Sequence, residues 1–416
     1  MNGHAAHGRE RSSGRGSNGG QSRELRPRVE VLESRCLLAS SLAAGTLTID
    51  GTTKANLIDV SQAGGRIVVL IDGANTDPAN PNGYVEGDVQ AIVIRGLKGH
   101  DTIQIAAAIN KPATISGDQG NDTISSGSGD DTIIGNAGHD SISGGDGDDA
   151  TDGGAGNDTI AGDAGDDILL GGTGKDRLLG GNDLDALLGG VGNDSLDGGS
   201  DDDILAGGPG KDSLTGGSGS DLFSPIARGG LRTDFAAGTD FDAAAPVTLG
   251  NFTDAGLEGT RTDQLNGAPA ITSNHVAGPV DYSALTNLVN GNQPTYGPHH
   301  SRPRVGDILG APVQPTGLFD FILDDADLVH NLEHGHAWLS YDPGLLPAID
   351  ALRLEILVSA FGPGRGVILT PRPANGDAIA LASWARLETL GGFDFDKIVD
   401  FIFTNRGHAP EGFITP

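Results

Sequence analysis

A nine-residue repeat constrains the fold of this chain more than any other feature of its sequence. Twelve consecutive nonapeptides run from Gly117 to Ser224, and each carries an aspartate at its sixth position. The residue two places after that aspartate is Ile, Leu or Phe in eleven of the twelve units, and Thr151 is the exception. One short strand cannot bury its single apolar side chain alone, so the units must stack into a solenoid.

Each unit, such as GGAGNDTIA at 153–161, combines glycines, an aspartate and a short strand. Glycines allow positive φ and leave room for a cation beside the backbone. Two units form one coil of a parallel β-roll, and carboxylate and carbonyl oxygens are the ligands that calcium prefers, so we expect the ions between the turns of neighbouring coils. The twelve predicted calcium ligands are Asp122, Asp131, Asp140, Asp149, Asp158, Asp167, Asp176, Asp185, Asp194, Asp203, Asp212 and Asp221.

The pattern G-G-x-G-x-D-x-U-x, where U is apolar, resembles the RTX family, the hemolysin-type calcium-binding repeats of exported bacterial proteins. GLKGHDTIQ at 96–104 is an isolated earlier copy, and the segment from Thr233 to Phe241 is similar to the one that caps such arrays. The resemblance implies several bound calcium ions and a roll that folds outside the cell. Six glycine positions carry other residues, which bears on the occupancy of single turns and not on the architecture: Asp118, Ser126, Asn136, Asp163, Asp183 and Asp201.

The repeat region is strongly acidic. Residues 117–224 contain 23 Asp, no Glu and three basic residues, and this net charge of −20 is most of the chain's −30. Glycine- and aspartate-rich sequence is also typical of disordered linkers, but a linker needs no apolar residue at every ninth position. We therefore predict disorder without calcium and a folded roll with it, because the charge repulsion opposes compaction until cations neutralise it.

Composition excludes several classes of partner. The acidic balance argues against nucleic acid and against an anionic membrane surface as partners. The lone Cys36 excludes an intrachain disulfide and gives no zinc-thiolate site. No apolar run approaches the roughly 18 residues that span a bilayer, so we predict no membrane span. The partners that we predict are the calcium ions of the repeats.

The first 40 residues are basic, and Leu32-Glu33-Ser34-Arg35 followed by Leu37-Leu38 resembles the LEPR-XLL segment of large exported bacterial proteins. That resemblance implies an export or targeting segment at 1–40 and a location outside the cell or on its surface. The alternative is a disordered basic tail. Short runs rich in β-branched residues follow, and with the isolated repeat they predict an N-terminal β cap at 41–116.

Beyond the repeats we expect a capping segment at 225–245, a linker at 246–279 and a small α+β domain at 280–416. Strand patterns occupy 336–342, 366–371 and 378–388, and helical spacing occupies 347–360 and 394–405. The predicted fold class is therefore mainly β: a parallel β-roll of glycine-rich nonapeptides with an N-terminal β cap, followed by a small α+β domain.

Histidines cluster in that last domain, in YGPHH at 296–300 and HNLEHGH at 330–336. These segments resemble a bacterial domain-of-unknown-function family with N-P-P-T-S-G-P-H and H-x-L-E-H-G motifs, which implies a fold and no established activity. His330 and His334 would share one helical face, and His299 could supply a third nitrogen for zinc or copper, with Glu333 as an oxygen ligand or anchor. The alternative is that these histidines hydrogen-bond loop carbonyls in a polar core.

Three functions fit these patterns. The first is an exported, non-enzymatic calcium-binding protein whose roll is a rigid spacer that presents the C-terminal domain. The second is a secreted metalloenzyme, a hydrolase or a redox protein, in which H-x-x-E-H would make Glu333 the general base. The third is a calcium-dependent surface adhesin that contacts polysaccharide or another cell. Convergence of His299, His330 and His334 around one open position would favour the enzyme.

Overall fold

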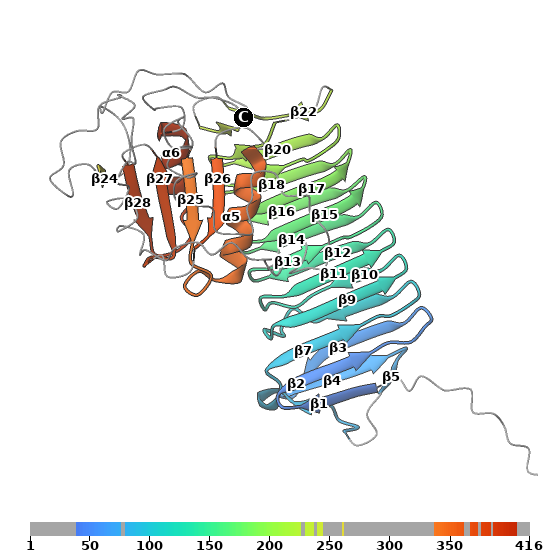
Figure 1. The fold of residues 1–416 in the computed structure, drawn as a ribbon. Coiled ribbons are helices and arrows are strands. Elements are labelled where there is room, and N and C mark those ends of the chain that lie inside the picture. Colours follow the sequence, from blue (N-terminus) through green and yellow to red (C-terminus); the bar gives the residue numbers. More distant parts are fainter. Residues whose placement is uncertain are drawn as a thin grey trace, which may run out of the picture. The chain divides into compact units, whose positions relative to one another are not determined.

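The nonapeptides alternate between two stacked parallel β-sheets, as the repeat predicts (Figure 1). Strand partners are 18 residues apart: Ile133 pairs with Thr151, which pairs with Leu169. The structure is a computed structural model that describes residues 39–75, 80–225, 229–236, 239–243, 260–261, 337–361, 367–372, 376–383 and 386–405. The parallel β-roll predicted from the sequence is therefore confirmed.

Sheet A and sheet B are the two walls of the roll. In strand order, sheet A contains β1 (Ala39–Ala43), β2 (Thr46–Asp50), β7 (Ala91–Arg95), β9 (Ala113–Gln119), β11 (Thr132–Ala137), β13 (Ala150–Asp152), β15 (Ile168–Gly174), β17 (Ala186–Gly192), β19 (Ile204–Ala206), β21 (Leu222–Phe223) and β23 (Phe241–Asp242). Sheet B contains β22 (Leu231–Arg232), β20 (Ser213–Ser218), β18 (Ser195–Ser200), β16 (Arg177–Asn182), β14 (Thr159–Ala164), β12 (Ser141–Asp146), β10 (Thr123–Ser125), β8 (Thr102–Ile105), β3 (Leu57–Ala63), β4 (Arg66–Ile71) and β5 (Ala74–Asn75), and β6 (Tyr84–Val85) pairs with β4.

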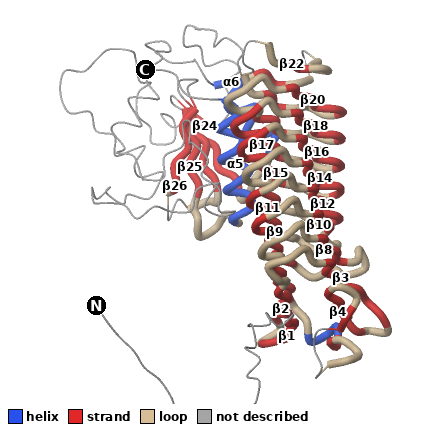
Figure 2. Tube along the Cα trace, turned by 90° about the vertical axis from the view of Figure 1, so that its right-hand side faces the viewer, coloured by secondary structure: helices blue, strands red, loops and turns tan. Residues whose placement is uncertain are grey.

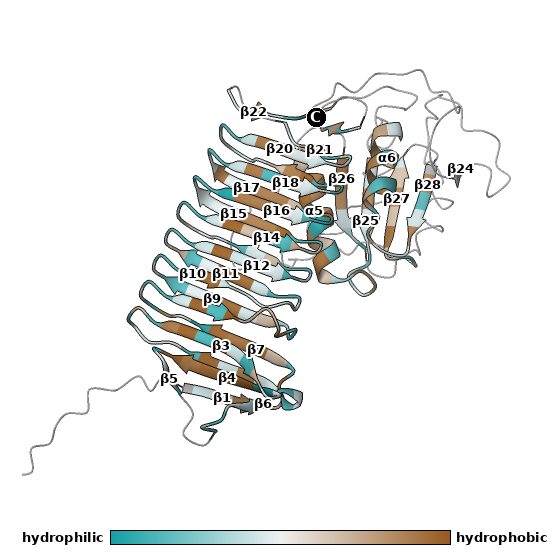
Figure 3. Ribbon diagram, turned by 180° about the vertical axis from the view of Figure 1, so that it is seen from behind, coloured by the Kyte–Doolittle hydropathy of each residue, from teal (hydrophilic) through white to brown (hydrophobic). Residues whose placement is uncertain are grey.

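The core of the roll lies between the two sheets. Eleven of the twelve nonapeptide strands send one apolar side chain inward, from Ile124 to Phe223, and these side chains belong to one buried cluster. The apolar bands recur from strand to strand in Figure 3. Thr151 occupies the same inward position with no exposed surface, and its hydroxyl has no hydrogen-bond partner among the described residues.

Substituted glycine positions keep the backbone of the repeat. Asp118, Asn136, Asp163, Asp183 and Asp201 all have φ between 70° and 83°. Asp and Asn are the side chains that tolerate this left-handed conformation best, because their short polar groups hydrogen-bond locally. These departures from glycine therefore preserve the turn geometry.

The parallel coils continue upstream of residue 117. β2, β7 and β9 pair in parallel, and so do β3, β8 and β10. The copy at 96–104, which is isolated in sequence, is thus a coil of the same roll in space. Antiparallel pairing of β1 with β2 and of β3 with β4 ends the stack, and a short 3-10 helix, η1 (Glu86–Asp88), precedes β7.

The C-terminal region is α+β, as predicted. Its sheet has the order β24 (Thr260–Arg261), β28 (Arg386–Leu390), β27 (Ile379–Ser383), β25 (Ala337–Tyr341) and β26 (Val367–Pro371). Helix α5 (Ala348–Phe361) connects the parallel strands β25 and β26, and helix α6 (Phe395–Asn405) follows β28. The run at 378–388, read from the sequence as one strand pattern, forms two antiparallel strands that pair Ser383 with Arg386.

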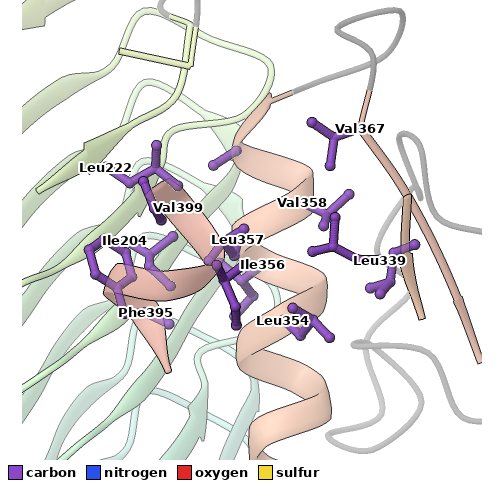
Figure 4. Close-up of a cluster of buried hydrophobic side chains, with 14 of the residues drawn as sticks. Ile204, Leu222, Leu339, Leu354, Ile356, Leu357, Val358, Val367, Phe395 and Val399 are labelled. Atoms are coloured by element: carbon purple, nitrogen blue, oxygen red, sulfur yellow. The ribbon is translucent and has the colours of Figure 1, made fainter. Parts of the chain in front are cut away.

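Helices α5 and α6 lie between this C-terminal sheet and the outer face of sheet A (Figure 2). Residues from β15, β17, β19 and β21 belong to the same buried cluster as residues of both helices (Figure 4). Sheet A of the roll therefore also forms one wall of the C-terminal core. None of the helices in the part of the chain that the structure describes is long and apolar enough to cross a membrane.

Candidate metal-binding turns

The twelve predicted aspartates form two rows of turns along the roll. Each aspartate immediately precedes a strand, so the rows are named after the sheet that the turn enters. The A row contains Asp131, Asp149, Asp167, Asp185, Asp203 and Asp221, and the B row contains Asp122, Asp140, Asp158, Asp176, Asp194 and Asp212. Every one of these residues is at most 3% exposed. The structure thus places each row as a buried ladder of carboxyl groups.

One oxygen of each carboxyl group links two coils. Asp140 Oδ1 accepts the backbone N–H of Asp122 at 2.8 Å, and Asp185 Oδ1 accepts that of Asp167 at 2.9 Å. In ten of the twelve the donor is the equivalent aspartate of the preceding coil, 18 residues earlier. Asp131 accepts instead from Ala113, and Asp122 accepts from Asp101, 21 residues earlier. The aspartate therefore has a structural role in coil stacking besides any role as a ligand.

The second oxygen has no such partner. Among the described residues, Oδ2 lacks a hydrogen bond at these buried aspartates: Asp101, Asp122, Asp131, Asp140, Asp149, Asp158, Asp167, Asp176, Asp185, Asp194, Asp203 and Asp212. This oxygen lies against the first glycine of its own turn. A Cβ on Gly135 would be 2.5 Å from Asp140 Oδ2 and 2.7 Å from the carbonyl oxygen of Gly153, which belongs to the next coil. Buried oxygens of two coils therefore meet where only hydrogen fits on the glycine.

Burial changes the acidity of these carboxyl groups. Desolvation raises the pKa of Asp149 to about 8 and that of Asp185 and Asp203 to about 9, and neighbouring aspartates raise each further against a backbone hydrogen bond that lowers it. In the B row, burial raises the pKa of Asp140 and Asp194 to about 6. At neutral pH and without a cation, Asp149, Asp185 and Asp203 are therefore protonated, whereas a carboxyl with a pKa of about 6 is mostly ionised.

The A row is also the more acidic row at its surface. The residue before the buried aspartate is Asp130, Asp148, Asp166 or Asp202 in four A-row turns. In the B row, the equivalent residues are Asn121, His139, Asn157, Lys175, Asn193 and Lys211. His139 Nδ1 accepts the backbone N–H of Asn157 at 2.7 Å, so this nitrogen is used within the turn.

These donors fit calcium. Calcium takes six to eight oxygen ligands, with carboxylates and backbone carbonyls among them. Eleven of the twelve turns supply a carboxyl group with an unpaired oxygen, and in turns such as that of Asp140 a carbonyl of the adjacent coil lies nearby. No cluster of three or more His, Cys, Asp or Glu side chains suited to a metal occurs among the described residues, so a cation here depends on backbone oxygens.

Asp101 was missing from the predicted ligands. It is buried, its Oδ1 accepts the backbone N–H of Asn56 at 2.7 Å, and burial raises its pKa to about 6. Its signal was present in GLKGHDTIQ at 96–104, but the 21-residue step from Asp101 to Asp122 breaks the nine-residue register. The extra residues lie between β8 and β10, where β9 does not begin until Ala113.

The predicted cap and histidine site stand differently. Asp234 accepts the backbone N–H of Gly216 at 3.0 Å and of Gly217 at 2.8 Å, and Phe235 packs edge-to-face on Phe223 at the end of the apolar column. His299, His330, His334 and Glu333, together with the segment at 1–38, lie outside the described residues.

Comparison with protein families finds two separate matches in the chain. Residues 116–151, 152–187 and 188–223 each match the RTX calcium-binding nonapeptide repeat, and residues 289–415 match a protein of unknown function, DUF3105. No curated protein matches the chain. The repeat region is thus similar to RTX calcium-binding repeats, and the similarity of residues 32–38 to LEPR-XLL segments stays a prediction.

Proposed function

We propose that this chain is an exported calcium-binding protein whose β-roll folds when it meets calcium outside the cell. The twelve A-row and B-row aspartates, together with Asp101, would hold the ions through Oδ2. Calcium would supply positive charge between turns in which aspartates far outnumber basic residues. The same property would keep the chain unfolded and ready for export at the low calcium concentration inside a cell.

The observation that carries this proposal is the row of buried, unpaired Oδ2 atoms. A buried polar oxygen without a partner is costly, and an ionised one more so. Holding Asp149 protonated at pH 7 in a cation-free roll, where its pKa is about 8 against the ordinary aspartate value of 3.8, costs on the order of 4 kcal/mol. Three such groups equal the whole free energy of unfolding of a typical domain, about 5–15 kcal/mol.

Calcium titration of the chelator-treated protein tests the proposal. Far-ultraviolet circular dichroism should show a cooperative gain of strand signal at roughly 10⁻⁴–10⁻³ M calcium, the range of extracellular calcium modules. Magnesium at the same concentration should not replace calcium, because it gives up its water reluctantly and demands octahedral geometry. Full strand signal in chelator at neutral pH would refute the proposal.

For the C-terminal domain, the sequence motifs support a zinc or copper ion held by His299, His330 and His334 with Glu333. Elemental analysis of the full chain should then find about one such ion per chain, and its loss in the His330→Ala/His334→Ala double variant. Calcium alone in both proteins would retire this site and the secreted metalloenzyme with it. A calcium-dependent adhesin would instead require that binding to a polysaccharide or cell surface is lost in chelator.

A further inference from the structure

The outer faces of the two sheets differ in polarity. On sheet A the residues flanking the inward side chain are apolar from β15 to β21 and at most 8% exposed: Ile168, Leu170, Ala186, Leu188, Ile204, Ala206 and Leu222. We call these seven residues the apolar flank. The equivalent residues of sheet B are mostly polar and less buried, for example Ser195 and Asp197 in β18. The outer face of sheet A is therefore suited to pack against another apolar surface, whereas the outer face of sheet B is suited to contact water.

Helix α5 covers the apolar flank along the axis of the roll. It contacts β15, β17, β19 and β21 in turn. Its 14 residues make it about 21 Å long, and four strands at about 4.8 Å spacing extend about 14 Å from first to last. The helix is therefore long enough to cross the whole flank, and Figure 4 shows Ile204 and Leu222 directed toward Phe395 and Val399 of α6 beside it.

Helix α5 buries apolar residues around most of its circumference. Leu354, Ile356, Leu357 and Val358 are four of its buried residues, and they cannot all face one neighbour because successive residues are about 100° apart. A helix that is apolar on all sides requires partners on two sides. Here one side is the C-terminal sheet and the other is the apolar flank. Without the roll, part of the core of the C-terminal domain would lie open to water.

Specific contacts hold the helices in place on the roll. Arg353 of α5 donates to the backbone carbonyl of Asp166, in an A-row turn, and pairs with Asp350 at 3.0 Å. Phe241, in the last strand of sheet A, packs on Phe403 at a ring distance of 5.2 Å.

One A-row turn departs from the acidic pattern next to the helices. Leu184 occupies the position that is Asp166 one coil earlier and Asp202 one coil later, and it packs against the buried cluster of α5 and α6. A departure from the acidic repeat thus coincides with the place where the helices lie. Its apolar side chain suits the interface and has no advantage in a solvent-exposed turn.

We infer that the C-terminal domain completes its core only on a folded roll, so that calcium controls the assembly of the whole chain. This inference rests on the proposed function, since it takes calcium to fold the roll. It adds that the region similar to DUF3105 completes its fold only when calcium is present, although its described residues contain no calcium turn. By linkage, docking of the helices must in return favour calcium binding by the roll.

The two tryptophans make the inference testable in the full chain. Both, Trp338 and Trp384, lie in the C-terminal region, so tryptophan emission reports on that region alone. Hydrogen exchange of peptides from 117–224 reports on the roll. During a calcium titration of chelator-treated protein, we expect a blue shift of the emission of buried Trp338 at the same midpoint at which the roll amides gain protection.

A matched pair of substitutions separates docking from roll folding. Leu188 and Leu179 both follow an inward leucine and precede two glycines, but Leu188 is covered by the helices and Leu179 lies on sheet B. Leu188→Asp should leave the calcium-dependent protection of the roll, move its midpoint to higher calcium, and abolish the tryptophan shift. Leu179→Asp should keep both transitions. If Leu188→Asp unfolds the roll itself, Ile204→Thr is the second variant, because a β-branched residue keeps the strand propensity.

The outcomes distinguish the two proposals. Roll amides that gain no protection with calcium would refute the proposed function. Roll protection with the same tryptophan emission in chelator and in calcium would refute the present inference alone. The inference also fails if a docking variant with a folded roll retains the full tryptophan shift of the Leu179→Asp control.

Discussion

The buried aspartates of the A and B rows, apart from Asp221, use their two oxygens differently. Oδ1 accepts a backbone N–H from the preceding coil, whereas Oδ2 has no partner among the described residues. An asparagine at the same position keeps one acceptor but removes the charge. The two contributions of a single side chain, stacking and cation binding, can therefore be separated by one substitution.

Asp149→Asn should have opposite effects with and without calcium. With calcium, loss of a charged ligand should weaken the sites it lines by about an order of magnitude, seen as a higher midpoint in the calcium titration. Without calcium, the cation-free roll should be more stable, because no carboxyl with a raised pKa remains at that position. Asp148→Asn, at the exposed neighbour, is the control. It should change both the calcium midpoint and the stability of the cation-free roll little. Equal effects of the two variants would contradict this division of roles.

Thr151 is the second residue whose environment makes a sharp prediction. Its hydroxyl is buried in the apolar column without a partner among the described residues. Thr151→Val keeps the shape and removes the unpaired group, so we expect the calcium-bound roll to gain about 1–2 kcal/mol in urea unfolding. Thr132→Val, at an outward position of β11, is the control. A loss of stability in Thr151→Val would mean that the hydroxyl has a partner after all.

At the scale of an element, the close approach of one coil to the next limits which residues the turn can accommodate. A Cβ on Gly156, where φ is 153°, would collide with the carbonyl oxygen of Gly138. The second glycine of the same unit, Gly154, is less restricted. A Cβ there would be 2.3 Å from the carbonyl oxygen of Asn136, a milder clash, and Asn136 itself holds a side chain at the equivalent position with φ 73°.

Gly156→Ala should therefore destabilise the roll by at least about 1–3 kcal/mol, combining backbone strain with a clash between coils. Gly154→Asn, which copies a residue that the chain already carries at 136, should cost much less. Urea unfolding in saturating calcium gives both values. Equal costs would show that the inter-coil contact at Gly156 relaxes freely.

The repeating elements could be predicted from the sequence because each unit carries the same local instructions. Asp122 and its equivalents recur every nine residues, and the helix and strand patterns of the C-terminal region are long enough to be read alone. Docking was not predicted, although a signal exists: ILL at 168–170 and ALL at 186–188 are apolar on both sides of the inward residue, unlike SLD at 195–197. Which helix covers such a strand depends on the fold and not on any local pattern.

At the scale of the whole molecule, the raised pKa values reverse the usual response to acid. A carboxyl whose pKa is higher in the folded than in the unfolded chain stabilises the fold fully below the unfolded value and loses that contribution as the pH rises through the folded value. Here the folded values of the cation-free roll lie at about 6 for Asp194 and about 9 for Asp203. Calcium and protons compete for the same carboxyl groups, so the calcium affinity should fall as the pH falls.

Calcium-free protein should consequently gain strand signal as the pH is lowered from about 8 to about 4.5, and the A row should respond at higher pH than the B row. Circular dichroism of metal-stripped protein measures the gain of strand signal as the pH is lowered. The calcium midpoint should rise over the same interval. Loss of strand signal on acidification, the ordinary behaviour of proteins with stabilising ion pairs, would contradict it.

The alternation of nonapeptides between two walls gives the roll a parity. Leu188 and Ile204 lie on the same wall because a whole unit on sheet B, with Leu196 inward, separates them. Removing 18 residues would shorten the stack by one coil and keep every later strand on its own side. Removing nine residues between Leu188 and Ile204 would preserve the spacing of the aspartates yet split the apolar flank across opposite walls. For the turns the sequence period is nine residues, whereas for the helices that pack on the roll it is 18.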